Sequence, residues 1–108
     1  MELTSITKEM YEISKRLDQA SRTIHSMARL KAETERDYRL SLAQEITKLR
    51  ADGMSVTLVS DTAKGNVADL KFERDLADGR YRAAIEALEA LKSQLTALQS
   101  ILRVQEEI

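Results

Sequence analysis

The chain has 108 residues, a net charge of −1, and no proline, tryptophan or cysteine. The length indicates a single domain, and the absence of cysteine excludes disulfides, thiolate metal sites and a cysteine nucleophile. Charged residues make up 32% of the chain with nearly balanced signs, which argues against nucleic-acid binding by bulk charge alone. With only 3 glycines, the chain has few places for turns, and its composition favours helices.

The sequence has no run of about 18 apolar residues, so we expect no helix that spans a membrane. Its N-terminus lacks a basic stretch followed by an apolar core, and we therefore expect no secretory signal. The absence of cysteine leaves the redox compartment open, and an intracellular protein is the default expectation.

Residues 5–52 are predicted to form one long helix, because apolar residues recur there in alternating steps of four and three. The polar residues Lys31 and Thr34 interrupt this apolar seam. Thr4 or Ser5 is the expected N-cap, and Gly53 marks the end of the helix. The seam consists of Ile6, Met10, Ile13, Leu17, Ala20, Ile24 and Met27, and continues at Tyr38, Leu42, Ile46 and Leu49.

Residues 53–65 break the helical pattern. Met54, Val56 and Leu58 alternate with Ser55 and Thr57, which is the period of an extended strand. We therefore expect a short extended bend here, which either pairs with a copy of itself or lies over the end of the hairpin.

A second long helix is predicted at residues 66–106, with Asn66 as its N-cap. Arg74 interrupts its seam near the start. The apolar positions of this seam are Leu70, Ala77, Tyr81, Ala84, Leu88, Leu91, Leu95, Leu98 and Leu102.

The predicted fold class is all-α: one long, coiled-coil-like antiparallel hairpin over residues 1–108 with a short extended bend. If the bend centres near Val59, facing residues add up to about 119, so that Tyr38 meets Tyr81 and Ile24 meets Leu95. Two helices cover only one stripe of each other and leave the rest of their apolar surface unburied. We therefore expect hairpins to associate into a helical bundle, with a dimer of hairpins as the first choice.

The second predicted helix has a further apolar row at seven-residue spacing: Leu76, Ala83, Ala90, Ala97 and Val104. This row is either a second contact face or a set of surface alanines that serve helix propensity. We predict an oligomer interface at Leu88, Leu91, Leu95, Leu98, Leu102, Ala83, Ala90 and Ala97.

A row of cations runs along the first predicted helix at seven-residue spacing. Such a row suits a phosphate backbone, and it is also what the solvated outer face of a coiled coil carries. If nucleic acid binds here, the residues that contact it are Lys15, Arg22, Arg29 and Arg36.

No arrangement of residues points to catalysis. The single histidine, His25, has no second ligand at metal-binding spacing, and acidic residues sit among basic neighbours on the helices. We therefore expect no catalytic residue, metal or cofactor. Binding of a protein partner is assigned to the apolar residues near the bend: Val56, Leu58, Val59 and Phe72.

Residues 45–100 resemble small uncharacterised two-helix proteins of temperate bacteriophages. The resemblance rests on GMSVTLVSDTAKG at 53–65, VADLK at 67–71, ERDLA at 73–77 and YRAAIEALEALK at 81–92. Those proteins sit among early genes for replication and recombination. The resemblance implies a cytoplasmic accessory factor in a bacterial host that carries phage DNA, and it brings no catalytic residues with it.

The sequence thus predicts a non-enzymatic, homo-oligomeric helical protein that binds a still unknown protein partner as an adaptor or inhibitor. The alternative prediction is a nucleic-acid-binding protein that uses the basic row of the first helix.

Overall fold

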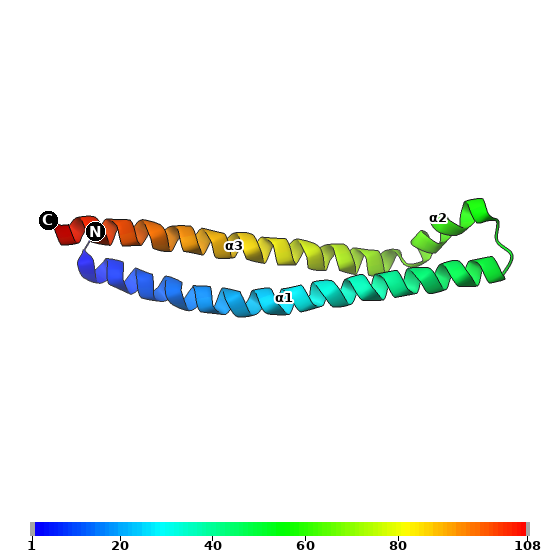
Figure 1. Ribbon diagram of the computed structural model, residues 1–108, viewed down its shortest axis with the longest axis horizontal. Coiled ribbons are helices and arrows are strands. Elements are labelled where there is room, and N and C mark those ends of the chain that lie inside the picture. The colour runs from blue at the N-terminus through cyan, green and yellow to red at the C-terminus, as the bar shows by residue number, and fades with distance from the viewer. Residues whose placement is uncertain (1, 108) are drawn as a thin grey trace. The chain divides into compact units, whose positions relative to one another are not determined.

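The computed structural model describes residues 2–107 and confirms the predicted all-α helical hairpin. It contains α1 (Leu3–Ala51), α2 (Val56–Asn66) and α3 (Ala68–Glu107), which follow one another along the chain as Figure 1 shows. Within the described residues there is no β-strand. The limits of α1 and α3 differ by no more than two residues from the predicted helices at 5–52 and 66–106.

Two compact units share these helices. The end unit comprises Met1–Ser26 and Arg82–Ile108, and the bend unit comprises Met27–Tyr81. The end unit therefore holds the first half of α1 and most of α3, while the bend unit holds the second half of α1, all of α2 and the start of α3.

The core of the end unit lies in the predicted seams. Ile6, Ile13 and Leu98 are buried, and Ile6 is fully inaccessible to solvent. Five partly buried residues of the same seams pack against them: Met10, Leu17, Leu91, Leu95 and Leu102. The heptad spacing brings these side chains to one side of each helix, which is why the core is a narrow strip.

The start of α1 differs from the predicted N-cap, whereas its end agrees with the predicted stop at Gly53. The helix begins at Leu3, and the amide of Ile6 donates to the carbonyl of Glu2, so neither Thr4 nor Ser5 is the N-cap. At the other end, the Met54 amide donates to the Leu49 carbonyl at 3.0 Å. The Gly53 amide likewise donates to Arg50 at 3.1 Å.

These two bonds form a Schellman motif, which requires a left-handed residue just beyond the helix. Gly53 supplies it, with a φ of 87°. The chain therefore turns sharply at residues 52–55, in a much shorter loop than the predicted bend.

The prediction of an extended bend at 53–65 is wrong for most of its length, because residues 56–66 form α2. Val59, Ala63 and Val67 follow one another at four-residue spacing, and all three are buried. Burial of this helical stripe outweighs the strand-like alternation of the apolar Val56 and Leu58 with polar residues, since tertiary packing overrides weak local propensity.

α2 and α3 are separated by a break at Val67. Its amide donates to Ala63 and its carbonyl accepts from Leu70 and Lys71, so it ends one helix and begins the next. Asn66, the predicted N-cap of the second long helix, is instead the last residue of α2. Its side-chain amide donates to the carboxylate of Glu45 at 2.7 Å, which ties α2 to α1.

Candidate interaction surfaces

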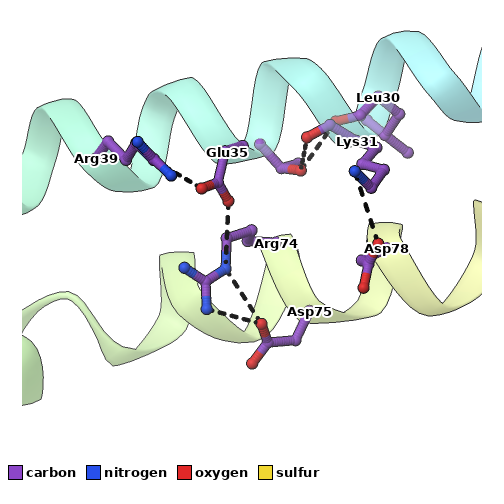
Figure 2. Close-up of polar contacts among 8 residues, drawn as sticks. Leu30, Lys31, Glu35, Arg39, Arg74, Asp75 and Asp78 are labelled. Atoms are coloured by element: carbon purple, nitrogen blue, oxygen red, sulfur yellow. Dashed lines mark hydrogen bonds and ion pairs between the residues drawn. The ribbon is translucent and has the colours of Figure 1, made fainter.

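Ionic and aromatic side chains meet between α1 and α3 in the bend unit, in what we call the polar layer: Lys31, Glu35, Tyr38, Arg74, Asp78 and Tyr81. Figure 2 shows Lys31 and Glu35 on one helix pointing toward Asp78 and Arg74 on the other. The Arg74 Nε lies 3.4 Å from a Glu35 carboxylate oxygen, and its guanidinium stacks 4.4 Å from the centre of the Tyr38 ring. The Lys31 ammonium lies 3.8 Å from Asp78 and 5.8 Å from the Tyr81 ring centre.

Arg74 is the most enclosed charge of the layer, with 25% of its side chain exposed. It also donates hydrogen bonds to Asp75, and these raise the pKa of Arg74 above its ordinary value. The guanidinium is therefore a permanent cation in the seam. Its flat face lies on Tyr38 while its edge reaches carboxylates, which is how arginine is accommodated at a half-buried site.

A shallow hollow of about 470 Å³ lies beside the layer, lined by Ala28, Lys31, Ala32, Glu35, Arg36, Arg39 and Tyr81. Its three cations are each engaged: Lys31 with Asp78, Arg36 with Asp37, and Arg39 with Glu35 at 2.7 Å. The charged residues of the layer thus pair with one another. These ion pairs hold α1 and α3 in a defined register.

The pairs in the layer show that the predicted hairpin register is wrong. Tyr38 lies against Arg74 rather than Tyr81, and Lys31 lies against Asp78 rather than Leu88. In the end unit, Ala20 lines the same hollow as Leu91, where the predicted register places Gln99. Facing residues on α3 come seven to ten positions earlier than predicted, because the chain turns at Gly53 and not near Val59.

Glu35 and Asp78 are the functional residues of the layer that sequence reasoning missed. The signal was present, since both seams carry a polar interruption, at Lys31 and Thr34 in one and at Arg74 in the other. Because a polar residue in a seam needs a polar partner, bringing the two interruptions close together moves the register from the predicted one toward the observed one.

The leucines assigned to an oligomer interface lie in the hairpin's own seam. Leu98 is buried, and Leu88, Leu91, Leu95 and Leu102 are half-buried. Of these, Leu91, Leu95, Leu98 and Leu102 belong to the core cluster of the end unit, where they pack with residues of α1. Each half-buried leucine still has one edge open to solvent, so the seam itself is incompletely covered.

The predicted interface alanines lie on a different side of α3. Together with their neighbours they form a second series with alternating steps of four and three, which we call the outer stripe. All of its members are exposed, and Val104 exposes 57% of its surface. The outer stripe consists of Ala83, Ala87, Ala90, Gln94, Ala97, Ile101 and Val104.

Three shallow hollows follow the outer stripe. One of about 390 Å³ includes Ala87 and is bounded by Ala84, Leu91 and four residues of α1. A second of about 290 Å³ includes Gln94, and a third of about 330 Å³ includes Ile101 and Val104. The stripe therefore borders hollows shared with α1 at Ala87 and Gln94, while the hollow at Ile101 and Val104 is lined by α3 alone.

The predicted partner-binding residues near the bend are mostly exposed. Val56, Leu58 and Phe72 expose 77%, 59% and 63% of their surfaces, whereas Val59 is buried at 5%. Val59 is therefore part of the core of the bend unit. Phe72 and Tyr11 are both exposed aromatic residues.

The four residues of the basic row are exposed, and each has an acidic neighbour on α1. Arg22 pairs with Asp18 at 2.8 Å, and Arg29 with Glu33 at 2.8 Å. Lys15 lies 4.0 Å from Glu12, and Arg36 lies 3.2 Å from Asp37. The hydrogen bond to Glu33 raises the pKa of Arg29. These pairs reduce the positive field that the row would present to a polyanion.

Over residues 2–107 the structure contains no cluster of three or more side chains suited to a metal ion. In the same range, none of the helices combines the length and apolar character needed to cross a bilayer.

Comparison of the chain with protein-family models, with curated proteins and with solved structures finds no match. The function is therefore argued from the surfaces described above.

Proposed function

We propose that this chain is a non-enzymatic helical interaction protein that associates with further helices, in the first place those of other copies of itself. The observation that carries the proposal is the incomplete burial of its apolar residues. Among residues 2–26 and 82–107 of the end unit, only Ile6, Ile13 and Leu98 are buried hydrophobic residues, while the four other seam leucines of α3 are half-buried and the outer stripe is exposed.

The energetic reason is the hydrophobic effect. Full burial of a leucine side chain contributes about 1.5–3 kcal/mol, so a half-buried leucine leaves roughly 1 kcal/mol to be gained when a further helix covers it. Leu88, Leu91, Leu95 and Leu102 are all in this condition. A bundle of hairpins covers these edges, whereas a single hairpin leaves them in water.

A second part of the proposal is that the assembled protein acts as an adaptor or inhibitor of a protein partner. Support comes from the apolar residues Val56, Leu58 and Phe72, which are more exposed than any residue of the seams. Such residues gain most from a partner that covers them. On the basis of the resemblance to small phage proteins, we further propose that the chain is an accessory factor of a phage or mobile element in the cytoplasm of a bacterial host.

The alternative, nucleic-acid binding along the basic row, has less support. Arg22, Arg29 and Arg36 each lie within 3.2 Å of a carboxylate, so binding of phosphate competes with existing ion pairs. Charge removal at these three arginines would weaken DNA binding and flatten its salt dependence if this reading were right.

The direct test is the molar mass in solution, measured by sedimentation equilibrium over the micromolar range. We expect a mass that is a multiple of the 12.2 kDa chain. Leu95→Asp should dissociate and largely unfold the protein, because it places an unpaired charge in the seam. Gln99→Asp, an exposed position one helical turn further on, is the matched control and should change neither mass nor helicity.

A monomeric mass at every concentration would contradict the proposal. So would a Leu95→Asp variant that keeps the full helicity and mass of the parent.

A further inference from the structure

The tripeptide Ala-Asp-Gly occurs twice in the chain, at residues 51–53 and at residues 77–79. Aspartate followed by glycine is chemically labile, because glycine has no side chain to hinder attack of its backbone nitrogen on the preceding carboxyl carbon. The two tripeptides are identical in sequence, and both lie in the bend unit. The structure gives them different backbone surroundings, from which we expect different reactivity.

We propose that Asp52 is a site of spontaneous isomerisation to isoaspartate and that Asp78 is protected from the same reaction. In the first step the backbone nitrogen of Gly53 bonds to the side-chain carboxyl carbon of Asp52, and the amide proton and the carboxyl OH leave as water. The product is a five-membered succinimide ring. Water that adds at the former side-chain carbonyl returns aspartate. Water that adds at the main-chain carbonyl of residue 52 breaks its bond to the Gly53 nitrogen and leaves isoaspartate, so the mass of the chain is unchanged.

The surroundings of Asp52 permit this attack. Asp52 and Gly53 follow the last residue of α1, and both are exposed. The Gly53 amide donates to Arg50 at 3.1 Å, at the very end of the helix. Helix ends fray, so this bond opens locally while the rest of α1 stays intact. The freed nitrogen then lies next to a carboxyl group that is open to solvent.

The surroundings of Asp78 oppose the same attack. Asp78 and Gly79 lie inside α3, a helix of 40 residues, in which each interior amide donates to the carbonyl four residues earlier. Release of the Gly79 amide therefore requires opening of the helix on both sides of it. Figure 2 shows the Asp78 carboxylate pointing toward Lys31, whose ammonium lies 3.8 Å away. This ion pair opposes the side-chain rotation that ring closure needs.

Isomerisation at Asp52 changes the end of α1. Isoaspartate carries the main chain through the side-chain carbons and so adds one methylene between residues 52 and 53. The two backbone hydrogen bonds of the Schellman motif depend on the normal spacing at this point. The modified chain therefore loses the stop of α1, close in sequence to the exposed residues Val56 and Leu58.

The test is to incubate the full-length folded protein at mildly acidic pH and to follow isoaspartate by peptide mapping. Trypsin cleaves after Arg50 and after Arg74, so one tripeptide falls in the peptide of residues 51–64 and the other in that of residues 75–80. Isoaspartate is identified by a shifted retention at unchanged mass, by fragmentation, and by labelling with an isoaspartate-specific carboxyl methyltransferase. We expect isoaspartate to accumulate at Asp52 at least ten times faster than at Asp78.

Two controls separate the effect of the fold from that of the local sequence. In urea that unfolds the protein, the rates at Asp52 and Asp78 should agree within about twofold, since the tripeptides are the same. Asp52→Glu keeps the charge, but its longer side chain can close only a six-membered ring, which forms far more slowly. This variant should lose the isoaspartate of residues 51–64 and keep the rate of residues 75–80 unchanged.

Equal rates at Asp52 and Asp78 in the folded protein would overturn the proposal. A difference that persists in urea would overturn it as well, because the local sequence and not the fold would then set the rate. Isoaspartate that still forms within residues 51–64 of Asp52→Glu would place the reaction at Asp61 instead. None of these results bears on the proposed self-association.

Discussion

Two glycines have different backbone conformations, and substitution by alanine should lower the stability at one of them and raise it at the other. Gly53 has a φ of 87°, which an L-residue adopts only at a cost of about 1 kcal/mol. Gly79 lies inside α3, and a Cβ placed there meets nothing within 4 Å. Alanine at this position should stabilise the helix by about 1 kcal/mol.

We therefore predict that Gly53→Ala lowers the midpoint of thermal unfolding and that Gly79→Ala raises it, each by several degrees. Circular dichroism measured on both variants at one protein concentration checks the prediction. A lower midpoint for Gly79→Ala would mean that a partner helix approaches the backbone at that position.

Among single residues, the sequence allowed prediction of those whose role follows from periodicity. The seam positions Ile6, Ile13 and Leu98 are buried as their heptad spacing requires. The partners of Lys31 and Arg74 could not be found in the same way, because Glu35 and Asp78 have the spacing of ordinary solvated residues. Their role depends on which parts of the two helices face each other.

At the scale of elements, the two long helices were predictable and α2 was not. In α1 and α3 the heptad spacing of apolar residues repeats over many turns. A single polar residue in the seam therefore has little effect on the prediction of either helix. α2 has 11 residues, and its helical stripe of Val59, Ala63 and Val67 competes with a strand-like alternation in the same few residues. Only contact with the rest of the bend unit decides between the two.

The predicted register of the hairpin is wrong because the predicted bend is wrong. An extended bend of 13 residues moves the centre of the hairpin toward Val59, whereas the observed turn at Gly53 followed at once by α2 keeps it near residue 54. The apolar seams alone tolerate both arrangements, because a shift of seven residues sets one heptad repeat on another. The polar layer distinguishes them, since the shift would set Lys31 against Ile85 and Leu88 and would separate Glu35 from Arg74.

We therefore predict that the double substitution Lys31→Leu and Arg74→Leu lets the bend unit adopt the shifted register. Disulfide formation between added cysteines reports the register. Leu42→Cys with Leu70→Cys, one turn beyond Tyr38 and Arg74, reports the observed register, and Leu42→Cys with Ala77→Cys reports the shifted one. The parent sequence should link only the first pair, and the double variant should link both.

If the double variant still links only the first pair, the register is set by α2 and its hydrogen bond from Asn66 to Glu45 instead of by the polar layer.

For the whole molecule, the exposed surface is large for the mass. The chain exposes 7967 Å², whereas a folded monomer of 12.2 kDa is expected to expose roughly 6,100 Å². The excess has an apolar share, which includes the outer stripe and the open edges of the seam leucines. The proposed association of copies would reduce that surface.

Association also links stability to concentration, since a partner that binds only the folded chain stabilises it by mass action. We predict that the thermal midpoint rises with protein concentration. Unfolding curves recorded over a wide range of concentrations measure this. A midpoint independent of concentration for the parent protein would indicate a self-sufficient monomer.

Because of the break at Val67, α2 can open locally without opening of the long helices on either side. The segment is short, and only Val59 and Ala63 within it are buried. Its local opening therefore costs less free energy than opening of either long helix, and its amide protons are the ones that should exchange earliest with solvent. If the proposed partner binds at Val56 and Leu58, it binds the segment whose opening costs the least free energy.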